Sequence, residues 1–376
     1  MGFQQPANWW IDQRQLYRRS PTFNTTPKYT DNCRLCTRVY GNLQVQISFK
    51  EVATDCEKAL QQMLKLDGLS QSASARFHSI LVALVCVAGM SSAGAQDIEP
   101  RAYSNAPIGV NFLIAGYAYT KGGLSIGPSL PITNPNLNTT SAVFAYARVL
   151  DLWGMSAKFD ATVPYTWLSG SAEYQGQTHS RIVDGFANST FRLSINFYGA
   201  PALTLKEYAD WEQDLIIGAS LRVVAPSGQY DDSKLVNIGT NTWAFKPQVG
   251  ISKAIGPWTL ELTAAATFYT DNHDFFGGND LSQAPLYSLQ GHVIYGFRSG
   301  IWASIDATYF TGGRTTVNGV LNSDLEQNWR LGGTLAFPVN RENSIKFYAS
   351  KGVAARTGDN YDLIGVAWQY RWGGGL

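Results

Sequence analysis

The chain has 376 residues, of which 15% are charged, 45% are hydrophobic and 13% are aromatic, and its formal net charge is +1. This composition excludes a disordered chain, which has few aromatic residues and a high net charge, and it gives no basic surface for nucleic acid. Because about a quarter of the residues in soluble domains are charged, a soluble globular protein is not the default expectation.

The first 95 residues fall into two predicted parts. Residues 1–62 show no sustained period and stay unassigned, either as a misassigned translation start or as a genuine N-terminal extension. Residues 63–95 contain the uncharged run Ile80 to Met90, preceded by Arg76 and followed by Ala93-Gly94-Ala95. We interpret 63–95 as a secretory signal peptide cleaved after Ala95, since the run is too short to cross a bilayer as a helix. The alternative is a buried core helix.

All four cysteines precede residue 95, so the mature chain that we predict, residues 96–376, has no disulfide framework. Cys33 and Cys36 have the spacing of a zinc-binding pair, but neither a second such pair nor a nearby pair of histidines completes four ligands. The sequence therefore predicts no metal site and no cofactor.

Residues 96–376 alternate between apolar and polar side chains with a period of two. In the stretch 258–268, for example, Leu260 and Leu262 alternate with Glu261 and Thr263, which is typical of a two-faced β-strand. Twelve such runs are predicted, over residues 108–119, 141–150, 155–167, 187–197, 214–225, 242–253, 258–268, 286–297, 301–310, 328–338, 344–353 and 361–372. They are longer than ordinary globular strands, and their length suits tilted transmembrane strands.

The predicted connections alternate between short and long. Tight turns are expected at 151–154, 256–257, 298–300 and 340–343, whereas polar, glycine-rich loops such as 120–137 and 271–284 follow the odd-numbered runs. Two connections fit this alternation poorly, because 199–213 is long for a turn and 357–360 is short for a loop. Short periplasmic turns opposite long external loops are characteristic of outer-membrane barrels.

Aromatic residues gather near the ends of the predicted strands, as expected for rings at the level of the lipid headgroups. They are Tyr165, Trp167, Phe197, Trp243, Trp258, Tyr295, Trp302, Tyr309, Trp329, Trp368, Tyr370 and Trp372. The alternative is a soluble β-sandwich, whose strands are shorter and whose loops do not alternate in length. We therefore predict an all-β, transmembrane, antiparallel up-and-down β-barrel of about 12 strands in the bacterial outer membrane, with lipid around it.

If the apolar face meets lipid, the charged residues of the strands line the interior. This places Lys158, Asp160, Arg192, Arg222, Lys246, Glu261, His292, Asp306, Arg330, Lys346 and Arg371 in the lumen. They can set the selectivity of a narrow pathway with a mild preference for anions, or pair with one another and only stabilise a filled barrel. Inward aromatic residues are few, namely Tyr269, Trp302, Phe310 and Tyr348.

Several stretches resemble a known family. They include Ala225-Pro226-Ser227-Gly228-Gln229-Tyr230-Asp231, the segment from Lys234 to Asn241, Pro285 to His292, and Thr311 to Thr316. With these stretches the chain, from about 97 to 372, resembles the outer-membrane transporters of the meta-pathway of phenol degradation. The resemblance implies uptake of a small solute, such as a phenol or another hydrophobic carbon source, and it carries over no substrate-binding residue. The final Gly373-Gly374-Gly375-Leu376 departs from the usual aromatic end of such barrels.

Two other functions stay open at this stage. A structural or adhesive surface barrel would keep its lumen plugged and bind through its loops. An outer-membrane hydrolase would need a nucleophile, a base and an orienting group, but the mature chain holds only His179, His273 and His292, and none has a partner that the sequence identifies. We therefore expect no catalytic residues. The sequence does not determine the oligomeric state.

Overall fold

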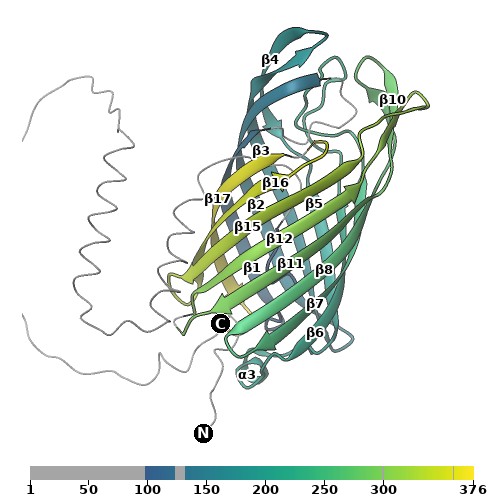
Figure 1. The fold of residues 1–376 in the computed structure, drawn as a ribbon. Coiled ribbons are helices and arrows are strands. Elements are labelled where there is room, and N and C mark those ends of the chain that lie inside the picture. The colour runs from purple at the N-terminus through teal and green to yellow at the C-terminus, as the bar shows by residue number, and fades with distance from the viewer. Residues whose placement is uncertain (1–97, 123–131, 299, 359) are drawn as a thin grey trace, which may run out of the picture. The chain divides into compact units, whose positions relative to one another are not determined.

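The computed structural model describes residues 98–122, 132–298, 300–358 and 360–376. The predicted extension 1–62 and signal peptide 63–95 lie outside the described residues. In the part that is described, an antiparallel sheet closes into a barrel, with the hairpin strand β4 and a small second sheet at one end and the short helix α3 at the other (Figure 1).

Twelve strands form the wall of the barrel. In chain order they are β1 (Val110–Gly122), β2 (Ile132–Leu152), β3 (Met155–Tyr174), β5 (Thr190–Tyr198), β6 (Leu215–Val224), β7 (Ala244–Ile255), β8 (Trp258–Tyr269), β11 (Leu286–Gly296), β12 (Trp302–Gly312), β15 (Glu326–Pro338), β16 (Asn343–Ala354) and β17 (Tyr361–Gly373). β1 pairs with both β2 and β17, which closes the ring. The predicted barrel of about 12 antiparallel strands is confirmed.

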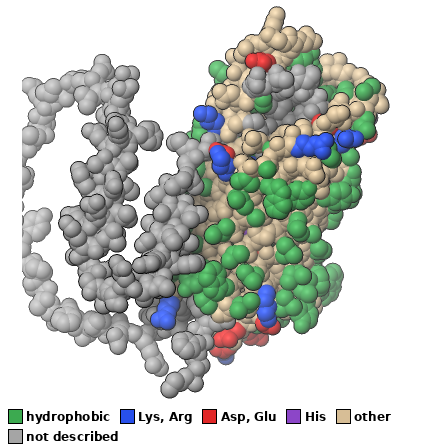
Figure 2. All heavy atoms as spheres, viewed as in Figure 1, with side chains coloured by type: hydrophobic (Ala, Val, Ile, Leu, Met, Phe, Trp, Pro, Cys, Tyr) green, Lys and Arg blue, Asp and Glu red, His purple; other side chains and the backbone are tan. Residues whose placement is uncertain are grey.

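The two faces of the wall differ as the period of two requires. In β8, Leu262 is 51% exposed on the outer face, whereas its neighbours Glu261 and Thr263 are 6% and 4% exposed on the inner face. Figure 2 shows the outer surface, where hydrophobic side chains cover the middle of the wall and charged side chains lie toward its two ends. Because lipid cannot hydrogen-bond an open sheet edge, closure satisfies the backbone while the apolar face meets hydrocarbon.

One end of the barrel carries the short connections. β2 and β3 are joined at Trp153-Gly154, where both residues have positive φ, as a tight hairpin turn needs, and β7 and β8 are joined at Gly256-Pro257. The long connection 199–213, which fitted a turn poorly, contains α3 (Leu205–Tyr208), with Thr204 as its N-cap. Within the described residues, no helix is long and apolar enough to cross a membrane.

The other end carries structure that the sequence pattern did not reveal. β2 and β3 run further than predicted, and β3 continues into the hairpin with β4 (Gln177–Phe186). The expected loop 271–284 contains β9 (Asn272–Phe275) and β10 (Asn279–Gln283), which form a second sheet with β13 (Thr315–Val317) and β14 (Val320–Leu321). These strands were missed because they are only two to five residues long and mostly polar, which leaves no alternation to detect.

Candidate functional site

The interior of the barrel is the candidate site. All eleven charged residues predicted for the lumen alternate along their strands with neighbours on the outer face, such as Phe191 and Leu193 on either side of Arg192. Trp302 and Phe310 also lie on the inner face and are buried, so Trp302 does not belong to the aromatic residues at the membrane surface.

The chain ahead of β1 crosses this interior. We call residues 98–109 the N-terminal segment. An ideal Cβ on Gly332 of β15 would lie 2.7 Å from Ile98 Cδ1, and the adjacent Glu99 bonds side chains of β5 and β6. Since β15 and β5 lie on opposite sides of the ring of strands, the N-terminal segment spans the lumen.

Glu99 is the centre of a charged cluster. Its carboxylate accepts hydrogen bonds from both Arg192 and Arg222, whose side chains are only 17% and 13% exposed. Arg192 Nε also donates to Asp160 Oδ2 at 2.8 Å, and Lys246 lies next to Arg222 in the register of β6 and β7. Burial by itself raises the pKa of Glu99, but the charges of Arg192 and Lys246 outweigh that effect and hold the pKa below its ordinary value.

Tyr103 occupies a recess in the wall. Gly218 of β6 and Gly250 of β7 face each other in register, and a Cβ on either would lie within 2.4 Å of the Tyr103 ring. The ring is almost fully buried, and its hydroxyl lies 3.4 Å from Ser220 Oγ. The two glycines therefore provide the space that this ring fills.

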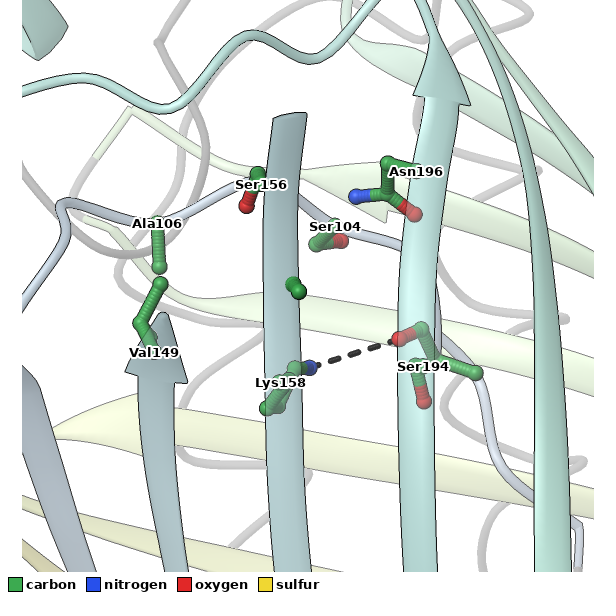
Figure 3. A pocket seen from close by; sticks show the side chains of 9 residues that line it. Ser104, Ala106, Val149, Ser156, Lys158, Ser194 and Asn196 are labelled. Carbon is green, nitrogen blue, oxygen red and sulfur yellow. Dashed lines mark hydrogen bonds between the residues drawn. The ribbon is translucent and has the colours of Figure 1, made fainter. Parts of the chain in front are cut away.

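Lys158 and Asn196 bind the backbone of the N-terminal segment. Lys158 Nζ donates to the Ala102 carbonyl at 3.3 Å, and Asn196 Nδ2 donates to the Tyr103 carbonyl at 3.0 Å. Figure 3 shows the small cavity beside these contacts, which polar side chains of β3 and β5 line together with Ser104 and with aliphatic residues such as Ala106 and Val149. Polar contacts thus hold the segment against the wall.

Arg101 contacts the opposite part of the wall. Its backbone N–H donates to Glu261 Oε2 at 2.7 Å, and its guanidinium carbon lies 5.0 Å from the centre of the Trp302 ring. Burial lowers the pKa of Arg101 to about 10, and the charge of Glu261 partly opposes this effect. Glu261 also accepts a hydrogen bond from Ser252 Oγ at 2.9 Å.

His292 lies in a second buried cluster. Its Nδ1 is 2.7 Å from Asp306 Oδ1, and Ser304 Oγ donates to Asp306 Oδ2 at 3.0 Å. The serine hydroxyl therefore bonds the carboxylate and not the imidazole, which is not the order of groups that activates a serine nucleophile.

Of the three remaining predicted residues, Arg330 and Arg371 lie apart from these clusters, whereas the charge of Lys346 acts on Glu99. Arg330 is fully buried, donates to the Tyr361 carbonyl and stacks on the Tyr361 ring at 3.6 Å. Lys346 lies 5.5 Å from the Tyr348 ring, and Arg371 Nε donates to the Arg341 carbonyl at the short-turn end. Arg330 and Arg371 thus make local contacts, whereas Lys346 is solvent-accessible although it is on the inner face.

Glu99, Arg101 and Tyr103 were missed as lumen residues by the sequence analysis. They precede the first strand, and no period marks a segment that returns into the barrel. The one available signal was three large polar side chains within five residues immediately before a membrane strand. No group of three or more His, Cys, Asp or Glu side chains among the described residues is placed to hold a metal ion.

Comparison with known proteins agrees with this architecture. The family model described as "Putative MetA-pathway of phenol degradation" matches residues 120–369. The chain belongs to this family. No curated protein matches the sequence.

Among solved structures, an outer membrane channel from Pseudomonas putida F1 is similar, with a TM-score of 0.61 and 17% identity over 73% of this chain and 100% of that chain. The β domain of the Bordetella autotransporter BrkA, with a TM-score of 0.41 and 10% identity, covers 70% of this chain and 100% of its own. The first likeness shows the fold; the second is too low to carry an argument. A closed barrel with an apolar outer face and this family membership places the protein in the bacterial outer membrane.

Proposed function

We propose that the protein is an outer-membrane channel through which small solutes enter the cell, and that aromatic or other hydrophobic carbon sources such as phenols are among them. The observation that carries the proposal is the charged interior, occupied by a segment that is held by polar contacts. Family membership and the channel from Pseudomonas putida F1 support the same role.

We infer that residues 98–103 of the N-terminal segment are a removable obstruction, although Tyr103 also packs against Ala200 and Ile216, whereas Ala106 belongs to a core cluster with Val110 and Phe112. Four of its residues, Glu99, Arg101, Ala102 and Tyr103, make hydrogen bonds to side chains of the wall, and water can replace each of these bonds. Around this path, the wall contributes more basic than acidic side chains. The basic ones are Arg192, Arg222, Lys246, Lys158 and Lys346, and the acidic ones are Asp160, Glu261 and Asp306. We therefore propose a narrow pathway with a mild preference for anions.

The test compares the wild-type chain with a variant lacking residues 98–103, both purified and placed in planar bilayers. We expect small, anion-preferring conductance for the wild type and several-fold larger conductance for the deletion, because the obstruction is gone. Intact cells producing the protein should also take up labelled phenol faster than cells lacking it. Absence of conductance from both forms would exclude a channel.

The N-terminal segment also favours a second candidate, a structural or adhesive barrel whose lumen stays filled. Liposome swelling separates the two: a structural barrel admits no sugar even when residues 98–103 are removed.

We propose no enzymatic activity, because the hydroxyl of Ser304 bonds Asp306 and not His292. Turnover of an ester or phospholipid by the purified barrel that His292→Ala abolishes would contradict this part of the proposal.

A further inference from the structure

Three basic side chains form a row across neighbouring strands of the inner wall. Arg192 of β5 is directly opposite Arg222 of β6, which is directly opposite Lys246 of β7. On the other side of Arg192, Asp160 of β3 is its register partner and an acid that the wall contributes to this row. Adjacent like charges away from bulk water repel each other unless an anion lies between them.

The second acid of this cluster, Glu99, does not belong to the wall. It comes from the N-terminal segment, and its two carboxylate oxygens are divided between the two arginines, Oε2 to Arg192 and Oε1 to Arg222. Planar guanidinium groups bind a carboxylate through paired N–H donors, and the interaction is strong where water is scarce. The wall therefore presents a carboxylate-binding site, which the protein fills with its own residue.

An aromatic ring occupies the wall beside this site. Tyr103 lies in the recess of Gly218 and Gly250, and its hydroxyl reaches Ser220, which is two residues from Arg222 along β6. Residues two apart on a strand lie about 6.6 Å from each other on the same face. Withdrawal of the N-terminal segment would thus expose a ring-sized recess and a carboxylate site within reach of one small molecule.

We propose that this row of Arg192, Arg222 and Lys246, together with the Gly218–Gly250 recess, binds aromatic carboxylic acids, and that Glu99 and Tyr103 are a tethered substitute for that solute. The proposal rests on the channel function, since it names the class of solute that the pathway takes. Solute and N-terminal segment compete for one site, so the solute stabilises the form in which the segment is withdrawn.

The test is calorimetric titration of the purified barrel in detergent with 3-phenylpropanoate. We expect Glu99→Gln to tighten binding at least tenfold relative to the wild type, because the competing charge is gone. Adding Arg222→Gln to that variant should return binding to the wild-type level or weaker. The matched control is Asp362→Asn, which breaks the exposed pair with Lys351 and should behave as the wild type does.

Two further ligands test the two halves of the site. The neutral 3-phenylpropan-1-ol should bind E99Q at least tenfold more weakly than the acid, and so should acetate, which lacks the ring. Equal binding of the alcohol, equal binding of acetate, or no gain from E99Q would each overturn the proposal. Heat-modifiable migration in gels verifies that every variant is folded.

The channel function and this inference fail differently. If neither the wild type nor the barrel lacking residues 98–103 conducts, the channel is excluded. If it conducts but E99Q binds 3-phenylpropanoate no more tightly than the wild type does, the channel stands and the carboxylate site is excluded.

Discussion

The inner wall places charged side chains where their partners decide their effect on stability. Asp306 is fully buried on β12 and accepts from Ser304, with His292 Nδ1 at 2.7 Å. By contrast, Lys351 and Asp362 form a pair near the outer ends of β16 and β17, where the lysine side chain is 65% exposed. A buried polar group that loses its partner keeps its desolvation cost, whereas an exposed group regains water.

We therefore expect Asp306→Ala to lower the free energy of unfolding by roughly 3 kcal/mol, since it leaves the buried His292 and Ser304 without their acceptor. The control Asp362→Ala should cost at most about 1 kcal/mol. Urea unfolding of the barrel from lipid vesicles measures both. Equal losses for the two variants would show that water reaches Asp306 in the folded barrel.

At the scale of elements, the two ends of the barrel are built by different means. The short-turn end is fixed by local chemistry, such as the left-handed Trp153-Gly154 turn and the reciprocal hydrogen bonds between Thr204 and Glu207 that begin α3. The other end depends on contacts between loops distant in sequence, such as Asn318 Nδ2 donating to Asn279 Oδ1 of β10, and on pairs within one hairpin, such as His273 of β9 with Asp280 of β10. These polar contacts are solvent-exposed and respond to solution conditions.

The hairpin of β9 and β10 is expected to depend on pH. The hydrogen bond to Asp280, with the carboxylate charge, raises the pKa of His273 above its ordinary value. Because the pKa of His273 is raised in the folded state, the stabilisation of the hairpin by the His273–Asp280 pair is complete below the ordinary pKa of histidine. It is lost as pH rises through the folded-state pKa. Amide exchange over residues 272–283, corrected for intrinsic rates, should show stronger protection in mildly acidic than in alkaline buffer.

The matched variants for this hairpin are His273→Gln, which should abolish the pH difference, and His179→Gln on β4, which should leave it unchanged. High salt should reduce the difference in the wild type, because both side chains of the pair are mostly exposed to solvent. A pH difference that survives in His273→Gln would assign it to another group.

At the scale of the whole molecule, the barrel is defined by two opposite surfaces of one sheet. Its outer face carries exposed residues such as Leu262, Ile305 and Phe347 on strands distant in sequence, and its inner face carries the charged row. Burial in lipid stabilises the outer face, whereas the inner face requires paired polar groups. Placing a charged residue on the lipid-facing surface should therefore lower the free energy of unfolding more than placing it on a surface outside the membrane.

We expect Leu262→Arg, on the outer face near the middle of β8, to lower the free energy of unfolding by about 2–4 kcal/mol, the range for arginine near the bilayer midplane. Ile182→Arg is the control, because Ile182 is 84% exposed on the β3–β4 hairpin beyond the barrel, and its cost should stay within about 0.5 kcal/mol. Urea unfolding from vesicles checks both. If Ile182→Arg lowered the free energy of unfolding as much as Leu262→Arg does, the result would indicate that the hairpin lies in the membrane.

The sequence by itself determined which segments cross the membrane and which face of each strand meets lipid. Each transmembrane strand needs an apolar residue at every second position. The alternation can therefore be recognised in the sequence of each strand alone, as in Leu260, Glu261 and Leu262. The tight turns were predictable for the same reason, because glycine and its neighbours fix each turn over a few residues.

Only the tertiary structure decided what fills the barrel. The pairing of Glu99 with Arg192 and Arg222 joins residues 93 and 123 positions apart, and the recess for Tyr103 exists only because Gly218 and Gly250 meet across two strands. A polar segment ahead of the first strand has no period of its own, since its partners are supplied by many strands at once. The small second sheet was hidden likewise, because its strands of two to five residues are too short to show a period.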